Sequence, residues 1–164
     1  MILYENFEEI MLLPKHVKES IITMTELVLP NHTNLIGTLL GGQLMHWIDI
    51  CGGLSAGKHS QQVCVTASVD RIDFHHPIKL GQVVQLVSSV NRAFHTSMEV
   101  GVRVFAQSFK DGTTFHTNTA FLTFVAIEDG KPVNVPEIIP ESDDEVRRYH
   151  EALSRREARL QNRG

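Results

Sequence analysis

The sequence predicts an α+β fold in which a long antiparallel sheet wraps around one central helix. Two observations lead to this prediction. Residues 42–58 carry apolar side chains around nearly the whole circumference of a helix, so such a helix must be covered on most sides. Four long β-rich runs follow it, joined by connectors with turn-forming residues. With 164 residues, 42% of them hydrophobic and 21% charged, the chain has the size and composition of one globular domain.

Residues typical of turns and loops separate the expected strands. A first strand, 21–28, ends before Pro30, and a loop rich in Asn, Thr and Gly fills residues 31–42. The dipeptide Asp111-Gly112 lies between the last two runs and favours a tight hairpin. Because the connectors are short, we expect the four later runs to pair in sequence order as an antiparallel meander. These runs are 62–74, 82–94, 98–109 and 114–127.

The central helix also predicts close packing within the chain and contact with a second chain. Gly52 and Gly53 each weaken a helix interior by about 1 kcal/mol relative to Ala, which favours close packing against another backbone. A single sheet leaves one face of the helix and one face of itself uncovered. We therefore expect dimerisation.

The flanking segments differ from this core in composition. We divide the chain into an N-terminal segment 1–20, a core domain 21–137 and a helical extension 138–164. In the extension, Ser142-x-x-Glu145 fits a capping box. We expect a surface helix that packs through a narrow apolar stripe and exposes its arginines to solvent, with an oligomer contact as the alternative. The stripe is Val146, Tyr149, Leu153 and Leu160, and the arginines are Arg155, Arg156, Arg159 and Arg163.

Charge and composition exclude several classes of function. The formal net charge is −4, which argues against a nucleic-acid partner. The N-terminus is acidic where a secretory signal is basic, and no run reaches the length of a membrane span, so we expect a cytoplasmic protein without membrane contact. Cys51 and Cys64 lie among apolar residues, and we expect reduced thiols in the core. The nine histidines show no metal-ligand spacing, so we expect no metal.

The chemistry is expected where the loop meets the central helix. Gly41-Gly42 precedes the helix, so bare backbone N–H groups can approach a ligand closely. The N–H of Gly42 is our candidate donor to a developing oxyanion. Asp49 follows about two turns later on the same side and is the only carboxylate of an otherwise apolar helix. Burial physics leaves Asp49 open between a functional group and a structural one that caps backbone groups or faces a solvated interface. Asn34 is likewise open between turn chemistry and holding a water or a thioester oxygen.

These residues resemble the motif of a known family. The pattern Asn34-x-x-Gly37-x-x-x-Gly41-Gly42 with Asp49 is similar to that of the acyl-CoA hydrolase branch of the hotdog-fold thioesterases, the YciA-like and brain acyl-CoA hydrolase-like enzymes. The resemblance covers roughly residues 23–136. It continues through Phe74-x-x-Pro77-Ile78-x-x-Gly81, Thr96-Ser97-Met98-Glu99 and Thr123-Phe124-Val125-Ala126.

The resemblance implies a hotdog fold and hydrolysis of acyl-CoA to a free acid and CoA, without a further cofactor. It implies that Asp49 acts as general base or nucleophile and that Asn34, from the opposite subunit, positions water or substrate. The catalytic unit would be a dimer, commonly assembled into a trimer of dimers. CoA would run along the subunit interface near Gly41, His75, the Pro77–Gly81 loop and the Thr96-Ser97 region. Leu40 stands where many relatives in the superfamily carry His, so no histidine role is expected there.

Two other functions compete with this one. A hotdog hydratase or dehydratase needs a His paired with a carboxylate in motifs such as His-Phe-Pro-Gly, which this sequence lacks. An acyl-CoA sensor would bind without turnover and usually carries a DNA-binding helix-turn-helix, for which residues 1–20 are too short. The presence of both Asn34 and Asp49 also favours catalysis.

Overall fold

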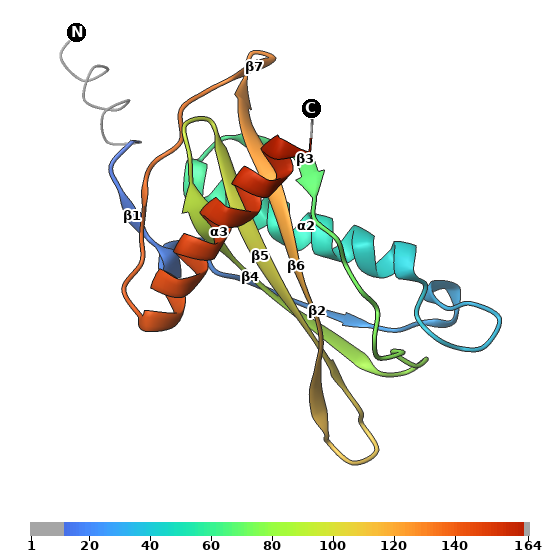
Figure 1. The fold of residues 1–164 in the computed structure, drawn as a ribbon. Coiled ribbons are helices and arrows are strands. Elements are labelled where there is room, and N and C mark those ends of the chain that lie inside the picture. Colours follow the sequence, from blue (N-terminus) through green and yellow to red (C-terminus); the bar gives the residue numbers. More distant parts are fainter. Residues whose placement is uncertain (1–11, 163–164) are drawn as a thin grey trace, which may run out of the picture.

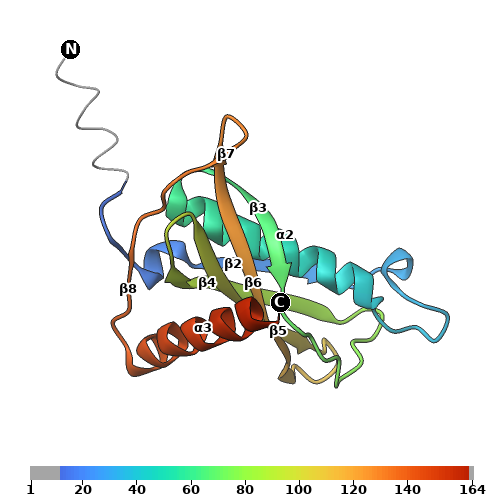
Figure 2. The same cartoon turned by 45° about the horizontal axis from the view of Figure 1, so that its top comes forward.

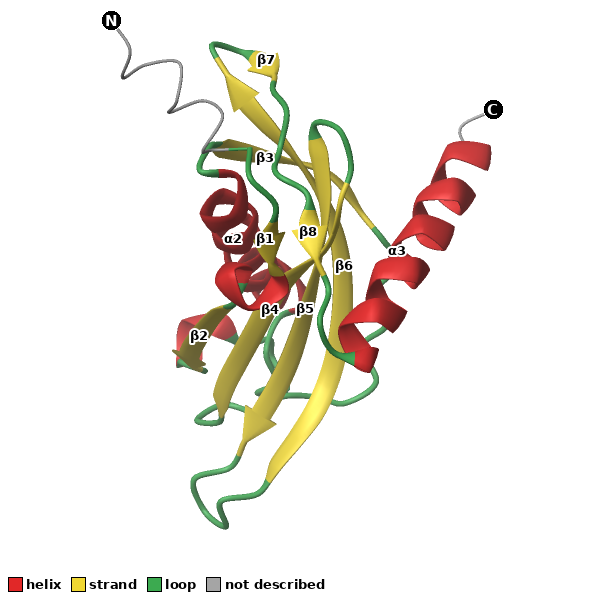
Figure 3. Ribbon diagram, turned by 90° about the vertical axis from the view of Figure 1, so that its left-hand side faces the viewer, coloured by secondary structure: helices red, strands yellow, loops and turns green. Residues whose placement is uncertain are grey.

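The computed structural model describes residues 12–162, and its centre is the helix α2 (Gly41–Ser60) held against a curved antiparallel sheet (Figure 1). The second long helix, α3 (Asp143–Gln161), lies on the opposite face of the sheet (Figure 3). The main strands are β2 (Ile22–Leu27), β3 (Val63–Val69), β4 (Val83–Ala93), β5 (Ser97–Gln107) and β6 (Thr114–Glu128). The short elements are β1 (Lys15–His16), η1 (Val17–Ser20), η2 (Pro30–His32), β7 (Lys131–Pro132) and β8 (Ile138–Ile139).

The strand order corrects one prediction. The sheet runs β2-β4-β5-β6-β3, so only β4, β5 and β6 form the expected meander. The strand β3 pairs antiparallel with β6 at the far edge and not with β4. It also ends at Val69, whereas we expected a strand to residue 74. Residues 70–82 form a crossing connector, which the adjacency of the two runs in sequence could not reveal.

The face of the sheet that packs on α2 forms the hydrophobic core. Successive residues of a strand point to opposite faces, so alternate positions of the central strands are buried against the helix. Gly52 permits a close approach, because a Cβ there would lie 3.0 Å from the Phe124 ring. We expected close packing of this glycine against a backbone, and its neighbour is an aromatic side chain instead. The fully buried strand residues include Val84, Leu86, Val90, Met98, Val100, Val102 and Val104.

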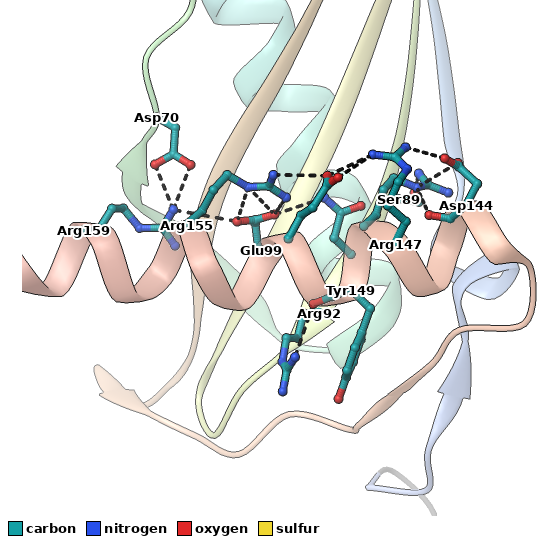
Figure 4. A network of polar contacts seen from close by, with 12 residues as sticks. Asp70, Ser89, Arg92, Glu99, Asp144, Arg147, Tyr149, Arg155 and Arg159 are labelled. Carbon is teal, nitrogen blue, oxygen red and sulfur yellow. Dashed lines mark hydrogen bonds and ion pairs between the residues drawn. The ribbon is translucent and has the colours of Figure 1, made fainter.

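The extension helix α3 begins as predicted, and it packs on the sheet through arginines as well as through part of the predicted apolar stripe. The Ser142 hydroxyl accepts a hydrogen bond from the Glu145 N–H, and the Glu145 carboxylate accepts from the Ser142 N–H, which confirms the capping box. Our expectation of solvated arginines is wrong for the described ones: Arg155 and Arg159 lie against the sheet and pair with acidic residues there (Figure 4). Of the predicted apolar stripe, Tyr149 packs against the hydrophobic core and Leu153 is half-buried, whereas Val146 and Leu160 are exposed. Arg163 and residues 1–11 lie outside the described part of the chain.

One face of α2 and one edge of the sheet stay open in the single chain. Ile50 and Leu54 point away from the sheet and are exposed. At the sheet edge, β3 pairs with β6 on one side, and Val63 is 72% exposed. An uncovered apolar helix face beside an open strand edge agrees with the expected dimerisation, which stays a prediction. Among residues 12–162, no helix is long and apolar enough to cross a membrane.

Candidate active site

Asp49 lies on the open side of α2, next to the edge strand. The Thr66 hydroxyl of β3 donates a hydrogen bond of 2.5 Å to Asp49 Oδ1. Among the described residues, Asp49 Oδ2 has no hydrogen-bond partner, and the side chain is exposed in the single chain. The structural alternative, in which Asp49 caps backbone groups, therefore finds no support in these contacts. A carboxylate held through one oxygen keeps the other available to a water or a substrate.

Thr66 is a residue of the candidate active site that the sequence did not identify. It lies opposite Phe124 in the β3–β6 register, directly before an irregularity of that pairing, and faces α2. Threonine is common in strands, so nothing in its local sequence separates it from its neighbours. Only the pairing of β3 with β6, which we did not predict, brings it beside Asp49.

The first turn of α2 offers unpaired backbone donors. The helix begins at Gly41, one residue before the predicted start, and its N-cap Leu40 provides no side-chain cap. The first backbone hydrogen bond into the helix comes from Leu44 to the Leu40 carbonyl, so the amides of Gly41, Gly42 and Gln43 have no partner among the described residues. A Cβ at Gly42 would meet nothing within 4 Å, so this chain's own packing does not require glycine there.

The distance between the two predicted reactive groups limits what one chain can do. Gly42 and Asp49 are seven residues apart on one helix, which places them about 10 Å apart along its axis. An oxyanion donor lies about 3 Å from the carbonyl oxygen, and an attacking group lies about 3–3.5 Å from the carbonyl carbon. The Gly42 amide and the Asp49 carboxylate of the same chain are thus too far apart to act on one thioester.

Asn34 organises its own loop. Its Oδ1 accepts hydrogen bonds from the N–H groups of Ile36 and Thr38, each at 3.1 Å, and its Nδ2 donates to Thr38 Oγ1 at 2.8 Å. The loop is continued by Gly37, whose φ of +77° suits glycine. The turn chemistry considered for Asn34 is therefore present. The second N–H of Nδ2 points to no described partner, which leaves it able to donate to a ligand.

The residues expected to contact CoA fall into separate groups within one chain. Gly41 and Pro77 line a cleft of about 350 Å³ together with Phe74 and His76. His75 lines a neighbouring cleft with Arg71 and His116, among others. Thr96 and Ser97 line a third pocket, on the α3 side of the sheet. The single chain therefore does not bring all the predicted contacts into one site.

The two cysteines lack the lowered pKa that is typical of a reactive thiol. Burial raises the pKa of both the Cys51 and the Cys64 thiol. Both are free, and Cys51 is fully buried beside the Ser88 hydroxyl of β4. Raised pKa values disfavour the thiolate, so neither cysteine resembles a nucleophile. Among residues 12–162, no three His, Cys, Asp or Glu side chains are grouped so that they could hold a metal ion.

Sequence comparison gives the family. Residues 36–113 match the Thioesterase superfamily. An uncharacterised acyl-CoA thioester hydrolase of Bacillus subtilis, YkhA, is 41% identical over 139 residues, 84% of this chain and 81% of that protein. Acyl-coenzyme A thioesterase 11 of Mus musculus is 42% identical over 139 residues, 85% of this chain and 23% of the mouse protein. The chain thus matches less than a quarter of the longer mouse relative.

Solved structures give the same result in three dimensions. The acyl-CoA hydrolase of Staphylococcus aureus, in complex with butyryl coenzyme A, coenzyme A and coenzyme A disulfide, superposes with a TM-score of 0.85 at 39% identity over 91% of this chain and 92% of that one. An apo hexameric acyl-CoA thioesterase superposes with a TM-score of 0.89 at 37% identity over 93% and 98%.

The same Staphylococcus aureus hydrolase has been studied with alanine in place of an aspartate, an asparagine and a threonine. The sequence intervals between those three positions equal the intervals between Asn34, Asp49 and Thr66. The relatives confirm the predicted fold and the predicted class of thiolester hydrolase. Since the shared sequence and the shared fold extend through most of the chain, this protein belongs to the thioesterase superfamily and, within it, to the hotdog-fold acyl-CoA hydrolases.

Proposed function

We propose that this chain hydrolyses acyl-CoA thioesters to a free acid and CoA, with Asp49 as the central catalytic group. The observation that carries the proposal is the Asp49 carboxylate itself. It is exposed on the open side of α2, and a 2.5 Å hydrogen bond from Thr66 holds one of its oxygens. The Staphylococcus aureus relative, with its CoA complexes and its alanine variants at matching intervals, supports this assignment.

The proposed reaction uses three groups of the protein. The thioester oxygen accepts a hydrogen bond from the Gly42 N–H, which stabilises the negative charge that forms on it. Asp49 takes a proton from a water while the water oxygen attacks the carbonyl carbon. The C–S bond then breaks, and the CoA thiolate leaves and is protonated. Asn34 orients the reactants through its remaining N–H. This scheme needs no cofactor.

Asp49 can also attack the carbonyl carbon directly. CoA then leaves from a mixed anhydride between Asp49 and the acyl group, and water hydrolyses this anhydride in a second step. A single turnover in ¹⁸O-labelled water tests for the anhydride, because only the anhydride route can place the label in Asp49. Attack by activated water places the label in the free acid, whereas hydrolysis of the anhydride at the aspartyl carbon places it in Asp49.

The proposed catalytic unit is a dimer in which Gly42 and Asn34 of one subunit face Asp49 and Thr66 of the other. The separation of about 10 Å along α2 supports this arrangement. The apolar open face of α2 and the free edge of β3 supply the contact surface. The hexameric relative supports a larger assembly, and we propose a trimer of dimers.

The proposed CoA contacts are Gly41 and Pro77 in the first cleft, His75 beside it, and Thr96 and Ser97 on the α3 side. These positions can belong to one binding path only if the ligand extends over more than one face or more than one subunit.

The cytoplasmic location stays a prediction that fractionation of cells would test.

The test is thiol release from acyl-CoAs of two to eighteen carbons, measured for the wild type and for Asp49→Ala. General base catalysis typically contributes about 10²–10⁴-fold. We therefore expect Asp49→Ala to lose at least about a hundredfold in turnover while its assembly, measured by light scattering, is unchanged. Activity near that of the wild type would make Asp49 structural.

The same panel separates the competing functions. CoA binding without thiol release from any acyl-CoA would favour a sensor. Hydration of crotonyl-CoA, followed by the loss of its enoyl absorbance, would favour a hydratase.

A further inference from the structure

The cleft of about 350 Å³ beside the first turn of α2 has mostly apolar walls. Figure 2 shows the connector between β3 and β4 running past this end of α2. The polar side chains that line the cleft are Thr38 and His76. The other lining residues are Leu39, Gly41, Leu44, Phe74, Pro77 and Ile78. Such a lining suits an apolar group better than one rich in amides or phosphates.

The cleft begins where the proposed reaction takes place. The thioester oxygen is proposed to dock at the Gly42 N–H, and the preceding residue, Gly41, lies in the wall of the cleft. A Cβ at Gly41 would lie 3.8 Å from the Phe74 ring, so this ring covers the start of α2. Phe74 is also 51% exposed in the single chain, so internal packing does not explain it. An acyl chain that enters the cleft from the thioester therefore meets this ring first.

The two halves of an acyl-CoA differ in what they need from such a cleft. The pantetheine arm of CoA carries two amides, whose N–H and C=O groups need hydrogen-bond partners when they are buried. The Thr38 hydroxyl is already engaged with the Asn34 side chain, which leaves His76 as the other polar side chain. An acyl chain has no polar group beyond its carbonyl. Leu44 and Ile78, which are 3% and 4% exposed, offer it an apolar floor.

Phe74 belongs to a stretch of the connector with few hydrogen bonds to the rest of the fold. In the described part of the chain, one hydrogen bond joins residues 71–77 to another element. In this bond the side-chain amide of Asn118, in β6, donates to the Asp73 carbonyl. Asn118 is 5% exposed, so its amide is held firmly by the surrounding sheet. The hydrogen bond thus fixes the backbone directly before Phe74.

The position of Asn118 in the sheet supports this role. The register between β5 and β6 shifts directly before it, where Thr117 is an extra residue in β6. The Thr117 hydroxyl donates to the Val104 carbonyl at 3.1 Å and closes this irregularity. Such bulges re-aim the side chains beside them. An apolar residue at the buried position 118 would need no partner, which indicates that the amide serves to hold the connector.

We propose that Phe74 determines which acyl groups this protein accepts, and that Asn118 is a positioning residue that holds Phe74 in place. The inference rests on the proposed thioesterase function and names the half of the substrate that enters the cleft. Because the ring lies at the reacting end, it contacts the first carbons of a straight acyl chain and excludes groups that are branched or cyclic next to the carbonyl. Gly41 then touches the junction of the acyl group with CoA, and Pro77, exposed at the rim, stays available to CoA.

The test of Phe74 separates the two halves of the substrate. Titration calorimetry measures the binding of free CoA and of S-butyl-CoA, a thioether that cannot be hydrolysed. We expect Phe74→Ala to bind S-butyl-CoA about tenfold more weakly, the factor for two methylenes that lose their burial, and to bind free CoA as the wild type does. With substrates, the ratio of kcat/KM for benzoyl-CoA to that for butyryl-CoA should rise by about tenfold or more.

Asn118→Leu keeps the volume of the side chain and removes the donor. We expect it to weaken S-butyl-CoA several-fold and to spare free CoA. In the double variant with Phe74→Ala it should add no further loss, because the ring that it positions is gone. A merely structural role would weaken both ligands or add its loss to that of Phe74→Ala. Thermal melting checks the fold, and Asn118→Ser gives the same comparison if the leucine variant does not fold.

The matched control is Phe109→Ala, which removes a phenylalanine that is 72% exposed between β5 and β6 and does not line the cleft. It should bind both ligands as the wild type does. Equal losses of free CoA and S-butyl-CoA in Phe74→Ala would place the CoA half in the cleft and overturn the inference. The same holds if Phe74→Ala behaves as the control does, or if the wild type binds S-butyl-CoA no better than free CoA.

The thioesterase proposal fails by a different result. A wild type that releases no thiol from any acyl-CoA would end that proposal. The calorimetric affinities need no turnover, so they would still show which half of the ligand occupies the cleft.

Discussion

The orientation of Asp49 depends on one hydroxyl group of the neighbouring strand. Thr66 donates to Asp49 Oδ1 at 2.5 Å, and within the described residues no other group is hydrogen-bonded to this carboxylate. Hydrogen bonds to charged groups contribute about 1.5–3 kcal/mol. A freely rotating carboxylate would spend less time in the reactive geometry, so Thr66 acts as a positioning residue for the proposed base.

Replacement of Thr66 by valine tests this role. Thr66→Val keeps the shape of the side chain and removes the donor, so we expect kcat to fall by roughly tenfold or more. Thr66→Ser keeps a hydroxyl and should stay within a few-fold of the wild type. The measurement is thiol release at saturating acyl-CoA. Equal kcat in the valine and serine variants would remove Thr66 from the mechanism.

A second single-residue effect concerns stability in acid. His59 is fully buried at the end of α2, and its Nε2 lies 2.8 Å from the Pro136 carbonyl oxygen, which can only accept. Nε2 is therefore the protonated nitrogen, and Nδ1 is buried without a partner among the described residues. Burial lowers the pKa of His59, since the charged ring would lose its hydration.

The sign of the pH effect follows from this shift. The folded protein binds a proton at His59 less readily than the unfolded chain, so the free energy of unfolding should fall as the pH drops below the unfolded pKa of about 6.5. This residue contributes at most about 1.4 kcal/mol per pH unit. His59→Gln keeps a donor for the Pro136 carbonyl and does not titrate. Urea unfolding at pH 7.5 and 5.5 should therefore show a smaller loss in this variant than in the wild type, and equal losses would contradict the assignment.

At the scale of elements, the sequence pattern predicted the features that depend on residues near one another in the chain. It missed strand pairing and helix packing, which depend on residues far apart in the chain. The helix α2, the hairpin between β5 and β6, and the capping box of α3 each follow from residues a few positions apart. The partner of β3 depends on the path of the chain around α2, so no local pattern contains it. The arginines on the packed face of α3 were likewise missed, because long arginine stems can cover a sheet as apolar residues do, and their acidic partners lie far away in sequence.

A buried ion pair, Arg155–Glu99, is one of the contacts that hold α3 on the sheet. Glu99 is fully buried, and its carboxylate accepts hydrogen bonds from Arg155, the shortest of them 2.7 Å, and from Asn91. Removing one partner of a buried pair leaves an uncompensated charge, which typically costs about 3–5 kcal/mol. Arg159 at 3.8 Å and Asn91 remain near Glu99, so we expect Arg155→Met to cost about 2–3 kcal/mol, below that range.

The double-mutant cycle with Glu99→Gln measures the pair itself. The double variant should be more stable than the sum of the two single losses implies, because the second change removes the unpaired charge. Urea unfolding of the four proteins gives this coupling free energy. Additive losses would show that Arg155 and Glu99 act independently.

At the scale of the whole molecule, a single chain holds the parts of the proposed site without assembling them. Gly42 and Asp49 lie on the same side of α2 but about 10 Å apart along its axis. The sequence could identify both groups, since each is a local feature of one helix. It could not show how they meet, because in the proposed dimer that depends on a second chain. The apolar open face of α2 next to the free edge of β3 is where such a chain would pack.

Mixing two inactive variants tests whether the site is shared between subunits. Gly42→Pro removes the backbone donor, and the first turn of a helix tolerates proline. Gly42→Ala is its control, since it keeps the N–H and a Cβ there meets nothing within 4 Å. We expect the proline variant to lose about 10²–10³ in kcat and the alanine variant to stay active.

A mixed dimer of Gly42→Pro and Asp49→Ala subunits contains one site with both defects and one with neither. If the chains pair at random, half of the dimers are mixed, so about a quarter of the wild-type activity should return after co-refolding. A mixture of Asp49→Ala with Thr66→Val provides the negative control. Those two residues meet within one chain, and no intact site can form from them. Recovery in the first mixture alone requires that the oxyanion donor and the carboxylate come from different subunits. Lack of recovery from folded, dimeric single variants would contradict a shared site.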